Sequence, residues 1–190
     1  SMADATIRPV SAGTGNWDVT TVANINEAIT QPSTAGDGTY ARHNGASTKI
    51  QEWNLTAPSD AGTITGVVVW LRVSCEEDGD NEMSVRIKVN GTWHSVSNSD
   101  GSVHDYNEWR QYTGTFSGGA MVGIAPVLEV TGDGSGSGSR GYLHNAYGLL
   151  AYTPAPAEQY AVKNGNYNDP TVWSTGVVPT VGTVYSNNYT

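Results

Sequence analysis

The sequence has little sulfur, little basic charge and no long apolar run, and each shortage excludes a class of protein. Its single cysteine, Cys75, excludes an intrachain disulfide, so stability must come from packing or from association between chains. The 9 basic against 18 acidic residues give a net charge of −9, which disfavours binding to a phosphate backbone. No stretch reaches the roughly 18 consecutive apolar residues of a membrane span. We therefore expect neither nucleic acid nor membrane insertion among its interactions.

Phenylalanine is almost absent, with one residue against 10 Tyr and 6 Trp, while glycine is abundant at 23 residues. A core built from this chain must therefore rest on Val, Ile, Leu, Trp and Tyr. β-Branched and aromatic residues favour strands, and the many glycines favour tight turns between them. The composition is typical of an all-β domain.

The clearest periodicity lies in residues 63–93, where two apolar series flank the acidic loop 76–82. Every second residue is apolar in both series: Val67, Val69, Leu71 and Val73, then Met83, Val85, Ile87 and Val89. A period of two with one apolar face indicates strands of an antiparallel sheet that packs on a second sheet. We predict a hairpin of two paired strands.

The other face of this predicted hairpin combines an aromatic ring with basic side chains. Trp70 and Arg72 on the first strand are expected near Arg86 and Lys88 on the second. Such a group is either a ligand-binding surface or a solvated sheet face on which long basic side chains partly cover the ring.

Alternation and turn residues together predict about eight strands between residues 3 and 153. That number is typical of an antiparallel jelly-roll β-sandwich, which we assign to residues 1–153. The alternating prolines of residues 154–159 predict an extended linker. Residues 160–190 are too few for a core of their own, so we interpret them as the beginning of a second, truncated domain.

No residue set in the sequence indicates a reaction or a required cofactor. The four histidines lack metal-ligand spacing, and neither a nucleophile elbow nor a phosphate loop occurs, which predicts a non-enzymatic protein. The loop carboxylates Glu77, Asp78 and Asp80 form either a structural Ca²⁺ site or a solvated acidic turn, without the twelve-residue calcium-loop pattern.

Sugar binding requires aromatic planes beside hydrogen-bonding groups, and the polar segment 95–107 offers a second candidate place for it. His104 and Tyr106 are the side chains we expect at the surface there. Trp53 and Trp109 are expected in the core, where most tryptophans of a small domain lie.

Several short runs, taken in order, resemble jelly-roll domains of bacteriophage tail, fibre and virion proteins, which look like carbohydrate-binding modules in fold. The runs cover residues 3–10, 25–27, 36–40, 53–60, 67–73 and 87–93. Because such modules often carry a structural calcium near the chain ends, the resemblance makes Glu27 and Asp37 further candidate ligands.

Residues 164–182, with the run Asn-Asp-Pro-Thr-Val-Trp-Ser, are similar to the opening of parallel β-helix domains of tailspikes. The resemblances imply a virion protein segment that reaches the outside by lysis and contacts other virion proteins. A host glycan is its implied partner, and a homotrimer its favoured oligomer. Two alternatives are a carbohydrate-binding module of a secreted bacterial polysaccharide-degrading enzyme and a purely structural spacer.

Overall fold

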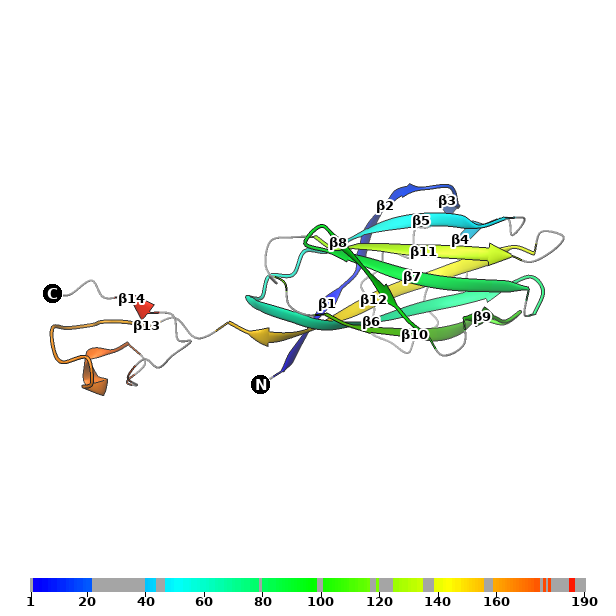
Figure 1. Cartoon of the computed structure of the whole chain (residues 1–190). Helices are drawn as coiled ribbons and strands as arrows, with labels where there is room; N and C mark the ends of the chain where they lie inside the picture. The colour runs from blue at the N-terminus through cyan, green and yellow to red at the C-terminus, as the bar shows by residue number, and fades with distance from the viewer. Residues whose placement is uncertain are drawn as a thin grey trace. The chain divides into compact units, whose positions relative to one another are not determined.

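The computed structural model describes residues 2–21, 40–43, 47–78, 80–98, 101–116, 119, 125–134, 139–155, 159–174, 176, 178 and 185–186. The chain divides into two compact units, residues 1–153 and 154–190. The first unit consists of two antiparallel sheets that face each other (Figure 1). The predicted all-β sandwich is confirmed.

Sheet A is six-stranded, with the order β10-β6-β12-β4-β3 and with β1 paired to β12. Its strands are β1 (Ala3–Ile7), β3 (Asp18–Thr21), β4 (Tyr40–His43), β6 (Gly62–Cys75), β10 (Glu108–Thr115) and β12 (Gly141–Pro154). Sheet B is also six-stranded, with the order β2-β5-β11-β7-β8 and with β9 paired to β7. Its strands are β2 (Pro9–Gly15), β5 (Lys49–Leu55), β7 (Asn81–Val89), β8 (Thr92–Val96), β9 (Ser102–Val103) and β11 (Val127–Gly134).

The core lies between the sheets and is filled by the alternating apolar residues of both. Leu71 of β6 and Ile87 of β7 are fully buried in one cluster, as is Trp53 of β5. The predicted inward faces of both strands and the predicted core position of Trp53 are therefore confirmed. Burial of apolar area of this kind is the main stabilising contribution to such a fold.

The predicted hairpin of residues 63–93, by contrast, is wrong. β6 pairs with β10 in sheet A, whereas β7 pairs with β11 and β8 in sheet B, so the acidic loop carries the chain from one sheet to the other. Alternation reports which face of a strand is buried and not which strand lies beside it. Two strands that face each other across a core share the pattern of two paired strands.

The predicted core position of Trp109 is also wrong. Trp109 is half-buried on β10, and the fully buried residue of that strand is Tyr112, three positions later. Because side chains alternate along a strand, inward Tyr112 puts Trp109 on the outer face of sheet A. There its ring packs edge-on against Tyr147, with 5.7 Å between the ring centroids.

The second unit has a small cluster of its own, made of Ala161, Val172 and Trp173. In residues 164–182, which the sequence likens to a β-helix opening, Pro170–Val172 form a capped 3-10 turn in which the Asp169 carboxylate accepts from the Thr171 N–H. The short strands β13 (Gln159–Tyr160) and β14 (Tyr185–Ser186) pair in parallel. Within the described residues, no helix has the length and apolarity needed to cross a bilayer.

A buried histidine makes the stability of the first unit sensitive to pH. His43 of β4 packs against the Trp17 ring, with 5.0 Å between the ring centroids. Burial lowers its pKa from 6.5 to about 4, although the hydrogen bond to Asn81 and the charge of Asp133 oppose the shift. The folded protein therefore keeps this imidazole neutral at a pH where the unfolded chain protonates it.

We expect the free energy of unfolding to fall as the pH drops from about 6.5 towards 4, because only the unfolded chain binds the His43 proton in that window. The slope contributed by this group approaches about 1.4 kcal/mol per pH unit, and above pH 6.5 its contribution is complete. Urea unfolding at several pH values, compared between the wild type and His43→Gln, isolates this slope. Equal slopes for the two proteins would contradict the assignment.

A second prediction concerns the alternating faces of β7. Ile87→Ala should destabilise the fold by about 2–5 kcal/mol, because it leaves a cavity in the core. Ser84→Ala on the exposed face of the same strand should change stability by less than about 0.5 kcal/mol. Urea midpoints of the two variants measure the contrast, and a similar loss in both would mean that Ile87 does not face the core.

Candidate functional site

A groove opens on sheet B, at the place where β8 leaves β7. β8 pairs with β7 as far as Val96, and Ser97 then exchanges two backbone hydrogen bonds of 2.9 Å with Thr113 of β10 in sheet A. The chain returns beside β7 at Gly101, whose carbonyl accepts from the Met83 N–H at 3.1 Å, and then pairs with β7 as β9 at residues 102–103. The edge position next to β7 is thus divided between β8 and β9, and a groove opens at the gap between them, with Met83, Ser84 and Val85 in its lining.

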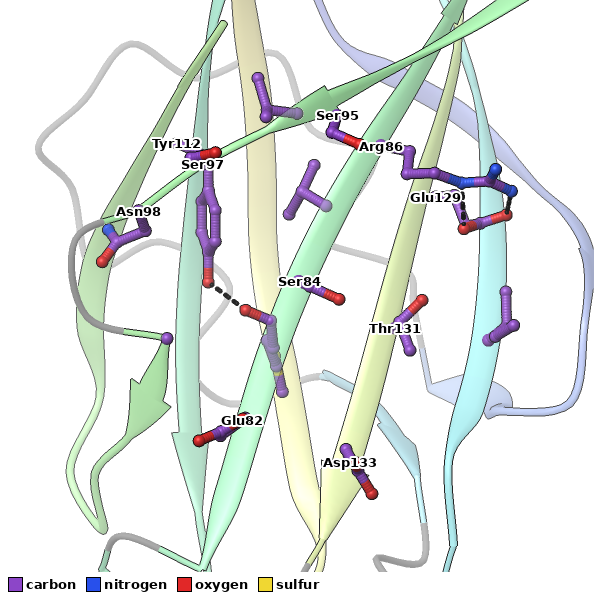
Figure 2. A pocket seen from close by; sticks show the side chains of 15 residues that line it. Glu82, Ser84, Arg86, Ser95, Ser97, Asn98, Tyr112, Glu129, Thr131 and Asp133 are labelled. Atoms are coloured by element: carbon purple, nitrogen blue, oxygen red, sulfur yellow. Dashed lines mark hydrogen bonds and ion pairs between the residues drawn. The ribbon is translucent and has the colours of Figure 1, made fainter.

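This groove has a volume of roughly 680 Å³, and its polar lining comes mainly from β7 and β11. The strand register makes three cross-strand pairs of groove-lining residues: Arg86 with Glu129, Ser84 with Thr131, and Glu82 with Asp133. Figure 2 shows the ion pair at one end, the hydroxyl pair in the middle and the two carboxylates at the other end. Antiparallel pairing therefore gives the groove an ordered row of polar groups.

Arg86 is fixed in place by contacts on two sides. Its Nε and Nη2 donate to the two Glu129 carboxylate oxygens at 2.8 and 2.7 Å, and its guanidinium lies 4.4 Å from the centroid of the Trp93 ring. Glu129 is only 6% exposed, and its carboxylate raises the pKa of Arg86. A bidentate pair of this kind restricts the guanidinium to one orientation.

The floor and one rim of the groove are less polar. The Tyr112 hydroxyl donates to the Met83 carbonyl at 3.1 Å, and its buried ring closes the floor. Ile50 on the rim is 42% exposed. It also lines a smaller hollow of roughly 320 Å³ beside β2 and β5, to which Asn16 and Glu52 contribute. The two depressions therefore meet at Ile50.

The four residues expected to form one aromatic and basic surface are divided between two faces. Trp70 and Arg72 lie on the outer face of sheet A, whereas Arg86 and Lys88 lie on the outer face of sheet B, because their strands belong to different sheets. Only Arg86 among them lines the groove. Lys88 lies just beyond it, with its Nζ 5.6 Å from the Trp93 ring centroid.

On sheet A, Trp70 belongs to a cluster of three rings. It stacks on Tyr147 with 6.4 Å between centroids and 9° between planes, and Trp109 packs on the edge of the same tyrosine. Tyr147 faces outward because the alternation of β12 shifts between Leu143 and Leu150, which both face the core. The rings cover one another, since Tyr147 is only 6% exposed.

His104 and Tyr106 do lie together at the surface. Their rings stack with 5.1 Å between centroids and 2° between planes, and Tyr106 is 55% exposed. The Asp78 carboxylate contacts His104 Nδ1 at 2.7 Å and raises the pKa of this imidazole. This contact joins the segment after β9 to the loop after β6.

The loop carboxylates considered for calcium are engaged with protein groups. Asp78 contacts His104, and a hydrogen bond with Asp80 raises the pKa of Glu77. In the part of the chain that the structure describes, no three His, Cys, Asp or Glu side chains are grouped as metal ligands. Glu27 and Asp37 lie outside the described residues, so the calcium site stays a prediction.

Comparisons with known proteins give likenesses of fold only. No protein-family model and no curated protein matches the sequence. A family 35 carbohydrate-binding module from Cellvibrio japonicus is 15% identical with a TM-score of 0.39, over 80% of this chain and 95% of that chain. A family 32 module from C. perfringens, solved with galactose, is 15% identical with a TM-score of 0.39, over 78% of this chain and 93% of that chain.

A truncated AlyQ with a family 32 module and alginate lyase domains is 16% identical, with a TM-score of 0.43, over 83% of this chain and 36% of that chain. Some similar chains thus include catalytic domains. None of these three likenesses is to a bacteriophage protein or to a parallel β-helix.

Proposed function

We propose that the chain is a non-enzymatic glycan-binding module and that the groove of sheet B holds the sugar. The observation that carries this proposal is the row of three cross-strand polar pairs along the groove. A sugar chain presents hydroxyl groups that both donate and accept hydrogen bonds at regular intervals. A rigid sheet surface with donors and acceptors in register is complementary to such a ligand.

The middle pair supplies groups that a sugar can use. The Ser84 and Thr131 side chains face each other across β7 and β11, where the Cβ atoms of paired residues are about 4.5–5.5 Å apart. Each hydroxyl can donate one hydrogen bond and accept others. The pair can therefore contact neighbouring hydroxyl groups of one sugar ring.

Arg86 and Ile50 add two further requirements of sugar recognition. The guanidinium is already held by Glu129 and Trp93, so little conformational entropy is lost when it donates to a ligand. The exposed Ile50 offers an apolar contact for a sugar C–H face. Because Ile50 is shared with the second hollow, an oligosaccharide can extend from the groove towards Asn16 and Glu52.

The aromatic cluster of sheet A is the second candidate place for the same function. Trp70 and Trp109 are half-exposed rings, and sugars stack on such planes. Tyr147 between them is nearly covered, which leaves less ring surface for a ligand. The groove is favoured because its hydroxyl and carboxylate groups face an open volume.

This proposal corresponds to the alternative of a carbohydrate-binding module in a polysaccharide-degrading enzyme. The assignment to a phage tail fibre or spike, the location in a virion, the trimer and the β-helical second domain stay predictions from the sequence. The genes beside the coding sequence test the viral context, and light scattering of the purified chain tests the trimer.

We expect the double variant Ser84→Ala with Thr131→Val to weaken glycan binding about fivefold to a hundredfold, because each of the two lost hydrogen bonds contributes about 0.5–1.5 kcal/mol. A glycan array with the full chain identifies the ligand, and isothermal titration then compares the affinities. Thr6→Val on β1 is the matched control, since its exposed hydroxyl lies in the other sheet.

Trp70→Ala separates the two faces in the same titration. Binding through the groove predicts that this variant keeps the wild-type affinity. If Trp70→Ala lost binding while the groove variant retained it, the site would lie on sheet A. If no glycan bound the wild type at millimolar concentration, the proposed function would be wrong.

A further inference from the structure

The groove carries more negative than positive charge. Three carboxylates, from Glu82, Glu129 and Asp133, and one guanidinium, from Arg86, line it within the described residues. Three negative charges and one positive charge give the groove lining a net charge of two negative charges. Because both Glu129 oxygens accept from Arg86, these two charges neutralise each other inside the sheet. The uncompensated charge therefore belongs to Glu82 and Asp133.

Glu82 and Asp133 are held side by side by the strand register. They face each other across β7 and β11, and both side chains are exposed. No ion pair between described residues includes either of them. Two like charges opposite each other destabilise an antiparallel pair, so their presence at this end of the groove is not explained by the stability of the sheet.

Two basic residues on the outer face of β7 lie at the opposite end of this row. Arg86 and Lys88 both contact the Trp93 ring, four and six positions along β7 from Glu82. Lys88 does not line the groove, and Arg86 is already paired. Glu82 and Asp133 lie at the end of the groove away from Arg86 (Figure 2). A ligand in the groove therefore experiences a potential that becomes more negative towards these two carboxylates.

We propose that this charge gives the groove its ligand selectivity: it takes uncharged glycan chains and rejects those that carry carboxylates or sulfates. The inference depends on the proposed function, because it concerns the ligand of the same groove. Carboxylate hydrogen-bond acceptors suit the hydroxyl groups of a neutral sugar. A uronate places an additional carboxylate near Glu82 and Asp133, where Coulomb repulsion opposes binding.

The experiment compares each uronate hexasaccharide with its carboxyl-reduced counterpart, which differs only at C6. The probes are the β-1,4-mannuronate and α-1,4-galacturonate hexamers and their reduced forms, titrated into the full chain by calorimetry at low salt. Of the two pairs of probes, we consider the pair whose reduced form binds more tightly. In that pair we expect the affinity for the reduced form to be at least about ten times the affinity for the uronate. The difference should shrink at 1 M salt, where charges are screened within about 3 Å.

The double variant Glu82→Gln with Asp133→Asn tests whether these two residues cause the difference. It should bring the affinities for the uronate and for its reduced form to within about threefold of each other. The control is Asp4→Asn with Asp60→Asn, which removes the same charge from sheet A and the segment before β6. The Asp60 carboxylate accepts from the Tyr152 hydroxyl at 2.7 Å, and the amide oxygen introduced by Asp60→Asn keeps an acceptor there.

The outcomes distinguish the two proposals. If the uronates bind as tightly as their reduced forms, or if the control variant changes the ratio as much as the groove variant, the charge selectivity is wrong while glycan binding stands. A chitosan hexamer that binds more tightly than every neutral probe would support the negative potential. If neither class binds and no glycan of the array binds at millimolar concentration, the proposed function is overturned and the selectivity with it.

Discussion

The shared interior of the two sheets is the constraint on which the rest of this structure depends. Because each strand buries alternate side chains, Leu71 and Ile87 fix which residues of β6 and β7 face outward. A shift of one residue in either strand would move apolar side chains into water and polar ones into the core. The outward row of Glu82, Ser84 and Arg86 is therefore a consequence of core packing.

The groove itself arises from an interruption of the sheet edge. The chain beside β7 leaves for sheet A at Ser97, after Val96 has paired with Val85, and it returns at Gly101, whose carbonyl accepts from the Met83 N–H at 3.1 Å. The two hydrogen bonds between Ser97 and Thr113 hold this departure in place. Edge positions are where a sheet can be opened without loss of its central pairing, and the pairing of β7 with β11 is complete along the groove.

The sequence showed which face of each strand is buried, but it did not show which strands pair with each other. Alternation correctly placed Val69, Val85 and Trp53 in the core, because burial of one face leaves a periodic trace in each strand. It could not show that β6 and β7 belong to opposite sheets, because that depends on contacts between distant segments. The expected cluster of Trp70 with Arg86 was lost for this reason.

The candidate site was recognised only in part from the sequence. Arg86 was singled out for its charge beside an aromatic ring, although the ring is Trp93 and not Trp70. Glu129 and Thr131 were not recognised, since only the register of β11 on β7 gives them a role. The prediction for Trp109 was wrong because it relied on the general preference of tryptophan for protein cores. On β10 the residue that faces the core is Tyr112, so Trp109 faces outward.

The strand register around Glu129 gives one residue of the groove a second role in the stability of the sheet. Glu129 of the central strand β11 lies between Glu52 of β5 on one side and Arg86 of β7 on the other. Arg86 thus offsets the repulsion between two adjacent acids, one of them nearly buried. A change of the groove hydroxyl groups would alter binding without disturbing the sheet, whereas a change at Arg86 would have to be accompanied by the loss of an acid on a neighbouring strand. Relatives of this chain should therefore exchange these three positions together.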